Sequence, residues 1–339
     1  MAELIRAEGL TRHFKIGGAL AQSTLHAVDD VSFTIGEREI VALAGESGSG
    51  KSTVARLLSR IYRPTSGTIT FNGEPLSKIR SRKDALSYAA RAPMVFQDPF
   101  SSLHPVFKVS HGVLRALKLH RPELTPEQRR AEAERVFEVV GLGDGMLDRY
   151  PHQMSGGQRQ RVGFAQALAT KPKLIIADEP VSMLDVSIRI GLLNLMVKLR
   201  DEEDVSILYI THDIASARYV ADRLIVMYAG QIAETGPMED VLSAPKHPYT
   251  QLLLSAVPDP KAPPPPDAAV EIETASGGSI TDRGEPPKVI DPVPGCRFRP
   301  RCPVAVGECS NVTPELKLAD GRQVACHVAQ SGTEVKAFS

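Results

Sequence analysis

The chain has 339 residues, which is longer than one ordinary domain, so we expect a large domain over about the first 250 residues and something smaller after it. Lysine plus arginine and aspartate plus glutamate both number 40, so the chain has no net charge and lacks the broad positive surface of a nucleic-acid-binding protein. It opens with no secretory signal, and no apolar run reaches the ~18 residues of a membrane-spanning helix, which predicts a cytoplasmic chain that meets a membrane only through other subunits.

Three apolar runs end in polar residues of catalytic type and predict one parallel sheet. They are residues 39–44, 174–177 and 205–210. Nearly continuous apolar strands are typical of a parallel sheet covered on both faces, and ligands bind at the carboxyl ends of such strands. We therefore expect the three strand ends to share one edge. The first ~40 residues and residues 68–73 resemble short strands with turns, which predicts an additional antiparallel layer.

A glycine-rich loop separates the first of these strands from a helix predicted over residues 52–58. It fits the Gly-x4-Gly-Lys-Ser pattern, in which backbone N–H groups and a helix N-terminus surround phosphates. Lys51 can reach the β and γ phosphate oxygens, and Ser52 is placed to ligate Mg²⁺. The pattern also fits a GTPase, a small-molecule kinase or a simple glycine-rich turn. The residues predicted to hold the nucleotide here are Gly45, Ser47, Gly48, Gly50, Lys51, Ser52 and Thr53.

Residues 108–170 have a helical pattern and predict a helical insertion into the α/β domain. Thr125, Pro126 and Gln128 stand at the spacing of a capped helix start with proline at its first position, and Gly141 follows the apolar positions of that helix.

A second capped helix is predicted from residue 156. Ser155 can cap it, and Gln158 stands at the spacing that completes a capping box. Gly156 and Gly157 would let a phosphate approach the bare helix N-terminus. Taken alone, the pattern is also explained by an ordinary well-capped helix.

Asp178 and Glu179 follow the apolar run 174–177. One carboxylate can bind Mg²⁺, and the other can polarise a water for in-line attack on a γ-phosphate. A bare Asp-Glu pair is common at exposed strand ends, so its position after this strand is what favours the functional interpretation.

The end of the chain has a different composition. Residues 258–289 are rich in proline and predict a semi-extended linker. Beyond it lie all four cysteines, Cys296, Cys302, Cys309 and Cys326. Disulfides are disfavoured in the cytosol, and the spacings match neither the usual zinc-finger pattern nor the ferredoxin pattern, so zinc, an iron-sulfur cluster and four unrelated thiols remain open from spacing alone.

Together these motifs resemble the ATP-binding subunits of ATP-binding cassette (ABC) transporters over about residues 1–257. The resemblance implies a P-loop NTPase fold of the α/β class with a RecA-like parallel sheet, and ATP hydrolysis by a head-to-tail dimer that sandwiches two ATP molecules. In that family the Ser-Gly-Gly-Gln signature, here residues 155–158, binds the γ-phosphate of ATP held by the opposite subunit.

The same resemblance implies a role for each matching residue. Phe14 would stack on adenine, although an apolar amino-terminal layer also suits a core phenylalanine. The remaining implied roles are Mg²⁺ sensing by Gln97, Mg²⁺ binding by Asp178 together with Ser52, general base for Glu179, dimer-interface loop for Asp185, and γ-phosphate contact for His212.

Residues 246–250, the proline-rich segment and residues 295–303 are similar to the oligopeptide/dipeptide branch of ABC importers. This implies peptide cargo, with oligosaccharides or nickel chelates as alternatives. Residues 178–188 are similar to the second of the two ATPases that such importers usually pair, which implies a homologous ATPase as partner in a heterodimer. The resemblance to this branch also implies two membrane permease subunits, an extracytoplasmic binding protein, and a position on the cytoplasmic face of the membrane. It favours a four-cysteine [4Fe-4S] cluster over Zn²⁺ in residues 290–339. The alternatives of another class are a soluble ATPase acting on nucleic acid or ribosomes and a cluster-bearing ATP-switched regulator.

Overall fold

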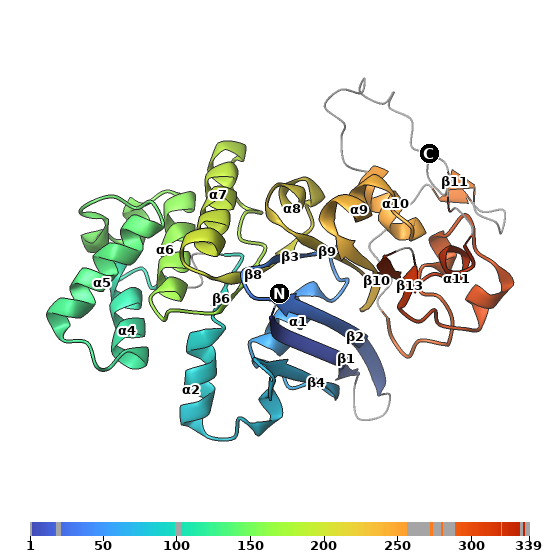
Figure 1. The fold of residues 1–339 in the computed structure, drawn as a ribbon, viewed down its shortest axis with the longest axis horizontal. Coiled ribbons are helices and arrows are strands. Elements are labelled where there is room, and N and C mark those ends of the chain that lie inside the picture. Colours follow the sequence, from blue (N-terminus) through green and yellow to red (C-terminus); the bar gives the residue numbers. More distant parts are fainter. Residues whose placement is uncertain are drawn as a thin grey trace.

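The computed structural model describes residues 2–17, 22–98, 103–255, 272–273, 279–280, 289–319, 321–332 and 335. Within these residues a large sheet forms the centre of the molecule and a smaller antiparallel sheet lies beside it (Figure 1). The helices α4, α5 and α6 lie at one end, and the carboxyl-terminal segment lies at the opposite end (Figure 1).

The large sheet has eight strands in the order β13-β14-β10-β9-β3-β8-β7-β6. Strands β9, β3, β8, β7 and β6 are mutually parallel, and the remaining pairs are antiparallel. Its strands span Ile40–Ala44 (β3), Met94–Val95 (β6), Leu174–Asp178 (β7), Ser206–Thr211 (β8), Arg223–Tyr228 (β9), Gln231–Pro237 (β10), Lys317–Ala319 (β13) and Arg322–Val324 (β14). The three predicted strand ends therefore meet at one edge, since β3, β8 and β7 are neighbours.

The smaller sheet has the order β2-β1-β4-β5 and is antiparallel, as predicted. Its strands are Glu3–Ile16 (β1), Ser23–Gly36 (β2), Ser66–Phe71 (β4) and Glu74–Pro75 (β5). The first two are 14 residues long rather than short. Register shifts interrupt their pairing at several points, so the polar-apolar alternation that indicates a long strand is broken in the sequence. A separate short pair joins Ile272–Glu273 (β11) to Ser279–Ile280 (β12).

Alternate residues of the central strands belong to two different cores. In β3, Ile40, Ala42 and Ala44 pack into one buried cluster, whereas Val41 and Leu43 pack into the other. The same alternation holds in β8, where Ile207 and Leu208 face opposite sides. Both faces of the sheet are covered, which is why these strands are apolar at every position.

Helices pack on the large sheet and extend beyond it. They are Lys51–Leu58 (α1), Arg82–Arg91 (α2), Ser110–His120 (α4), Pro126–Val139 (α5), Gly156–Leu168 (α6), Val186–Glu202 (α7), Ile214–Val220 (α8), Met238–Ser243 (α9), Pro248–Ser255 (α10) and His327–Gln330 (α11). Short 3-10 turns are Leu76–Lys78 (η1), Met146–Asp148 (η2), Pro151–Gln153 (η3), Arg299–Arg301 (η4) and Gly307–Ser310 (η5). No helix among the described residues is both long and apolar enough to cross a bilayer.

The capping prediction for α5 is confirmed. The Oγ1 atom of Thr125 accepts a hydrogen bond from the backbone N–H of Gln128, whose side chain accepts from the N–H of Thr125 in return, and Pro126 is the first helical residue. The region 108–170 contains helices α4, α5 and α6, as predicted. The predicted domain boundaries at about residues 257 and 290 remain predictions.

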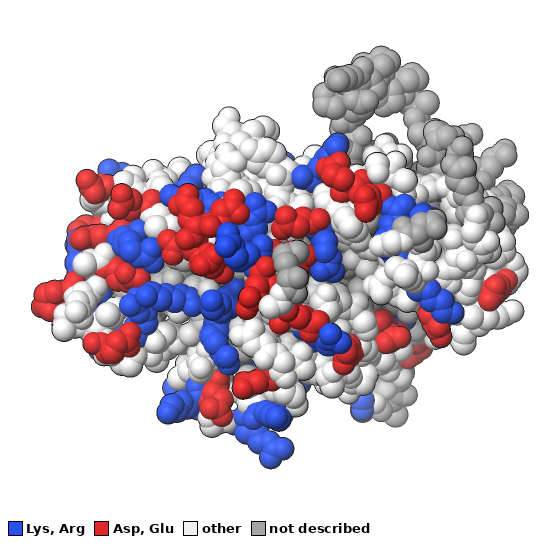
Figure 2. Space-filling view, in the orientation of Figure 1, with Lys and Arg blue, Asp and Glu red and all other residues white. Residues whose placement is uncertain are grey.

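The carboxyl-terminal segment packs against both sheets. Strand β14 pairs with β10 and so lengthens the large sheet, and Ile290 forms a bridge to Leu25 of β2. Most of the predicted linker, 258–289, lies outside the described residues. Figure 2 shows Lys/Arg and Asp/Glu side chains interspersed on one face of the molecule, without the single-sign patch expected of a nucleic-acid surface.

Candidate functional site

The loop between β3 and α1 is built on glycines that no other residue could replace without strain. Gly45 has φ +152°, and a Cβ atom there would lie 2.2 Å from the carbonyl oxygen of Met227. Gly50 has φ +105°, and its Cβ would lie 2.4 Å from the carbonyl oxygen of Ala27. The loop backbone is thus pressed against the ends of β9 and β2, and its open side faces a cavity.

Lys51 begins α1 and is buried inside this loop. Its Nζ atom donates to the carbonyl oxygens of Gly45 at 2.7 Å and Glu46 at 2.8 Å. Burial lowers the pKa of Lys51, against the opposing charges of Glu179, Asp178 and Glu46. The ammonium group is therefore held where a phosphate oxygen would improve its solvation, which fits the role predicted from the sequence.

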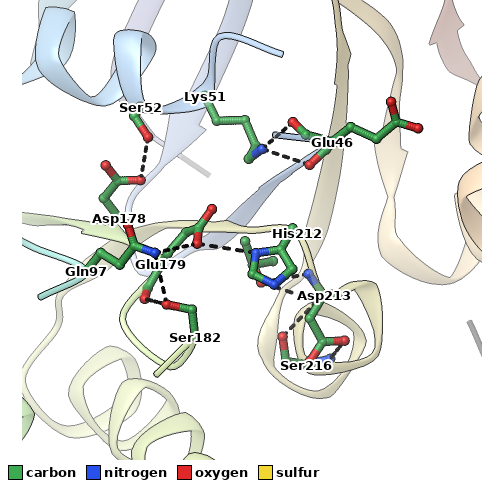
Figure 3. Close-up of polar contacts among 12 residues, drawn as sticks. Glu46, Lys51, Ser52, Gln97, Asp178, Glu179, Ser182, His212, Asp213 and Ser216 are labelled. Atoms are coloured by element: carbon green, nitrogen blue, oxygen red, sulfur yellow. Dashed lines mark hydrogen bonds and ion pairs between the residues drawn. The ribbon is translucent and has the colours of Figure 1, made fainter. Parts of the chain in front are cut away.

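Two oxygen ligands suited to Mg²⁺ face each other beside the loop. Ser52 Oγ donates to Asp178 Oδ1 at 3.1 Å, joining the start of α1 to the end of β7 (Figure 3). Burial raises the pKa of Asp178, and the neighbouring charge of Glu179 adds to the effect. A buried carboxylate next to a hydroxyl is a site that a hard divalent cation would stabilise.

Glu179 lies one residue further, at a point where the backbone turns into the left-handed region with φ +47°. Its Oε2 atom accepts a hydrogen bond from Gln97 Nε2 at 3.0 Å and lies 3.3 Å from His212 Nδ1 (Figure 3). Gln97 also contacts Ser182 Oγ at 3.3 Å. The structure thus brings together Glu179, Gln97 and His212, for which the resemblance implied the roles of general base, Mg²⁺ sensor and γ-phosphate contact.

A cavity of about 410 Å³ is lined by Lys51, Ser52 and Glu179 and by residues of the amino-terminal sheet. Phe14 of β1 is half-buried in its wall, edge-on to Tyr62 at a centroid distance of 5.4 Å. The other predicted nucleotide contacts in the lining are Ser47, Gly48, Gly50, Lys51, Ser52 and Thr53.

Seven of the described residues that line the cavity were not predicted from the sequence as site residues, and three of them have side chains that bear on nucleotide binding. Tyr62 and Arg56 line the cavity beside Phe14, and Val289 reaches it from the carboxyl-terminal segment. A lone tyrosine after a helix and a valine more than 200 residues away carry no local signal, so only the fold could identify them.

The Ser155 helix is capped as predicted, but it lies apart from this cavity. Ser155 Oγ accepts from the N–H of Gln158 at 3.3 Å, and Gln158 Oε1 accepts from the N–H of Ser155 at 3.0 Å. Ser155 is exposed, and the residues that line the cavity include none of positions 155–158. Asp185 precedes α7, and its side chain makes no capping hydrogen bond.

The four cysteines surround one small space in the carboxyl-terminal segment, together with His247 and Phe298. All four are free thiols, and three are buried. Burial raises the pKa of Cys296 to about 11 and that of Cys302 to about 12, so these side chains are neutral thiols near pH 7. Among the described residues, the group of three or more metal-binding side chains with ligand atoms within 4.8 Å of one another is His13, His26 and Asp29, which contains no cysteine.

Two family-level comparisons match the chain. The family described as ABC transporter matches residues 28–182, and the family described as oligopeptide/dipeptide transporter, C-terminal region, matches residues 233–309.

Relatives match nearly the whole chain. A probable peptide ABC transporter ATP-binding protein of Sinorhizobium fredii is 41% identical over 96% of this chain and 90% of its own length. A putative oligopeptide transport ATP-binding protein of Bacillus subtilis is 39% identical over 96% of this chain and 95% of its own. A di/tripeptide transport ATP-binding protein of Pseudomonas aeruginosa is 39% identical over 97% of this chain and 99% of its own.

Solved structures agree on the fold. An ATP-binding cassette in a dimeric, post-hydrolysis state bound to ADP and phosphate is 28% identical, with a TM-score of 0.62 over 69% of this chain and 99% of that chain. A protein of Clostridium perfringens that is part of an ABC transporter complex is 27% identical, with a TM-score of 0.61 over 72% of this chain and 92% of that chain.

The predicted [4Fe-4S] cluster on Cys296, Cys302, Cys309 and Cys326 is wrong. The relatives point to ordinary ABC ATPases without such a cluster, and among the described residues the metal-binding side chains with ligand atoms within 4.8 Å of one another include no cysteine. Nothing in the described residues supports the Zn²⁺ alternative either. The even number of cysteines was misleading because these thiols serve as packing residues: Cys302 belongs to the main core and Cys326 to a small core around Val324.

Similarity to ABC transporter ATP-binding proteins extends over nearly the full length of the chain. The structure has the phosphate loop, the carboxylates at the end of β7 and the parallel sheet expected of that family. The chain therefore belongs to the ABC transporter family, among the ATP-binding proteins that carry the oligopeptide/dipeptide transporter C-terminal region.

Proposed function

We propose that this chain is the motor subunit of a bacterial ABC importer for oligopeptides or dipeptides, in which ATP-driven dimer closure is coupled to translocation through membrane subunits. Membership of the family implies ATP hydrolysis with Mg²⁺, and the peptide transport proteins among its relatives support peptide cargo. The observation that carries the proposal is that Lys51, Ser52 and Glu179 line one cavity, with Asp178 hydrogen-bonded to Ser52 beside it.

Each of these residues has a distinct role in the proposal. Lys51 exchanges its two carbonyl contacts for β and γ phosphate oxygens. Ser52, Asp178 and Gln97 hold Mg²⁺, which supplies positive charge to the phosphates when bound. Glu179 accepts the proton of the attacking water as general base, and Gln97 and His212 hold its carboxylate in place. His212 is exposed, so it remains free to contact the γ-phosphate as well.

The signature residues 155–158 act on the ATP of a partner subunit in this proposal. Ser155 is exposed, precedes a 13-residue helix and lies outside the chain's own cavity. Large apolar side chains are exposed on the loop and helix beside it, at Met183, Val186 and Ile190. A helix N-terminus attracts phosphate, and an exposed apolar patch favours association, so this face suits a head-to-tail partner.

We propose that the partner is a second, homologous ATPase, so that the working unit is a heterodimer on the cytoplasmic face of the membrane. Two permease subunits dock where Phe96, Val106 and Phe107 leave apolar surface exposed next to α4. The intervening residues 99–102 lie outside the described residues. An extracytoplasmic binding protein delivers the cargo to the permeases.

The test is reconstitution of the complete transporter in vesicles with its binding protein. We expect ATP-dependent uptake of short peptides and peptide-stimulated ATP hydrolysis. The matched control carries Lys51→Ala in this subunit, which should reduce uptake at least tenfold. Uptake of an oligosaccharide or a nickel chelate in place of peptide would overturn the cargo assignment, and uptake unaffected by Lys51→Ala would overturn the motor role.

A further inference from the structure

The carboxyl-terminal segment, here residues 289–335, contacts the nucleotide site at three separate places. One contact reaches the phosphate loop directly, one reaches it through the turn after β9, and one forms part of the cavity wall. None of these contacts belongs to the catalytic residues described above.

The direct contact is an ion pair with a residue inside the phosphate loop. Arg301 Nη1 and Nη2 lie 3.0 and 3.2 Å from the two carboxylate oxygens of Glu46, so the pair is bidentate. The Arg301 side chain is only 18% exposed and that of Glu46 25%, and the guanidinium lies over the rings of Tyr228 and Phe298. A bidentate pair shielded from water fixes both position and orientation of its partners.

Glu46 transmits this restraint to the phosphate-binding groups. Its backbone N–H donates to Tyr249 Oη at 2.9 Å, and its carbonyl oxygen accepts from Lys51 Nζ at 2.8 Å. Glu46 is therefore fixed through its side chain, its N–H and its carbonyl group. A shift of this residue would move the carbonyl oxygen to which Lys51 Nζ is hydrogen-bonded.

The second contact works through Arg297. Its guanidinium donates to the carboxylate of Asp29 and, at 2.6 Å, to the carbonyl oxygen of Ala229. The next residue, Gly230, donates its N–H to the carbonyl oxygen of Ser49 in the phosphate loop at 2.9 Å. The loop is thus held at position 49 as well as at position 46.

Arg297 also belongs to the same cluster of polar side chains as His13 and His26, which lie beside the cavity. His13 Nε2 and His26 Nδ1 lie 3.1 and 3.0 Å from the two oxygens of Asp29. Although burial opposes ionisation, the hydrogen bonds from His26 and His13 and the charge of Arg297 lower the pKa of Asp29. This carboxylate is already paired with a cation, so the group serves as an anchor for the segment rather than as a metal site.

The third contact forms the wall of the cavity. Val289 lines it, and its carbonyl oxygen accepts from the N–H of His26 at 2.8 Å. Asp291 holds the same strand edge, because its N–H donates to the carbonyl oxygen of Thr24 and its Oδ1 accepts from the N–H of Thr24. The wall opposite the phosphate loop is therefore partly made by this segment.

We propose that the carboxyl-terminal segment completes the nucleotide site of its own chain, with Arg301 as a positioning residue that fixes the phosphate loop through Glu46. The proposal rests on the nucleotide site described above and adds to it a dependence on a region outside the ATPase core. Without Arg301 the loop samples more conformations, and nucleotide binding must first order it.

The test is a double-mutant cycle of the full-length protein with Arg301→Gln, Glu46→Gln and the double variant. The dissociation constant of a fluorescent ATP analogue is measured for each. We expect each single variant to weaken binding about five- to tenfold and the double variant to be no weaker than the singles, because one contact is lost in all three. The KM for ATP in hydrolysis should rise by the same factor, whereas kcat should stay within about threefold of the original value.

Arg299→Gln is the matched control, since Arg299 lies in the same 3-10 turn but is exposed, and it should bind the analogue as tightly as the original protein. Arg301→Lys keeps the charge without the fork and should give an intermediate dissociation constant, which provides the test if Arg301→Gln does not fold. Unchanged affinity in Arg301→Gln, or additive losses in the double variant, would overturn the proposal. Failure of the original protein to bind the analogue would instead contradict the nucleotide site itself.

Discussion

At the scale of single residues, Glu179 shows how the backbone prepares a side chain for chemistry. A non-glycine residue with φ +47° is uncommon and costs on the order of 1 kcal/mol, so the surrounding structure must enforce it. Its N–H donates to the carbonyl oxygen of Ile210 in β8, which fixes the turn at the strand end. The carboxylate then lies between Gln97 and His212 instead of continuing along the strand direction.

Replacing Glu179 by Gln should separate binding from hydrolysis. The amide keeps the size of the carboxylate but cannot accept the proton of water, so phosphate release should fall at least ~100-fold while ATP affinity stays within about threefold. Phosphate release and analogue binding measure the two effects. Glu202→Gln, an exposed change on α7, is the control. Hydrolysis near the original rate in Glu179→Gln would contradict the assignment of the base.

Asp178→Asn should act on the metal rather than on the nucleotide. Because burial already raises the pKa of Asp178, removal of this charge is tolerated by the fold but takes a ligand from Mg²⁺. The Mg²⁺ concentration needed for half-maximal hydrolysis should rise at least ~10-fold. ATP binding measured in the presence of a chelator should be equal or tighter, since a negative charge near the triphosphate is gone. Weaker binding without metal would show that Asp178 has another role.

At the scale of elements, α10 is held by buried polar groups on both sides. Glu234 of β10 accepts hydrogen bonds from the N–H groups of Lys246 and His247 at the helix start, and Arg322 of β14 pairs with it at 3.3 Å. Burial lowers the pKa of His247 to about 4, and its Nδ1 accepts from the N–H of Tyr249. The neutral ring is therefore part of the joint between the ATPase core and the carboxyl-terminal segment.

This joint should weaken in acid. The pKa of His247 is about 4 in the folded state and near 6.5 when unfolded, so below pH 6.5 the unfolded chain binds the extra proton more readily. The stability contributed by the neutral ring is complete above pH 6.5 and falls as the pH drops toward 4, by on the order of 2 kcal/mol at pH 5. Chemical denaturation of the original protein and of His247→Asn at pH 7.5 and pH 5 measures it. A pH-independent difference between the two proteins would contradict the prediction.

The elements also show where sequence reasoning succeeds and where it stops. Strands β3, β7 and β8 could be predicted because both faces are buried, so every position is apolar, and the two capping boxes because their hydrogen bonds are local. The Arg301–Glu46 pair could not, because 255 residues separate its partners and neither residue belongs to a motif specific for the other. The cysteine prediction was wrong because spacing left the role of the thiols open and the family resemblance that favoured a cluster does not reveal whether they ligate a metal or fill a core.

At the scale of the whole molecule, the catalytic groups and the Ser155 helix lie on different parts of one chain. The cavity is not lined by residues 155–158 of its own chain. We therefore propose that the Ser155 helix of a second chain completes it and that two chains close around ATP. The exposed Met183, Val186 and Ile190 then become buried on closure.

Ser155→Arg should block hydrolysis at the partner's ATP. The long cation would fill the helix N-terminus where the γ-phosphate is expected, and we predict a loss of at least ~100-fold at that site. In complexes with the second ATPase, single-turnover measurements with one phosphate loop disabled at a time separate the two sites. Hydrolysis at the ATP held by Lys51 should persist within about tenfold of the original rate. Equal losses at both sites would contradict the proposal that the signature acts across the dimer.

The pairing of residues 289–291 with the edge of β2 bears on how the protein matures during translation. The phosphate loop and every proposed catalytic side chain precede residue 213, whereas Val289, Arg297 and Arg301 emerge much later. A nascent chain can therefore assemble its catalytic core well before its cavity wall and loop restraint exist. In the proposal above, tight nucleotide capture then depends on residues that are translated last.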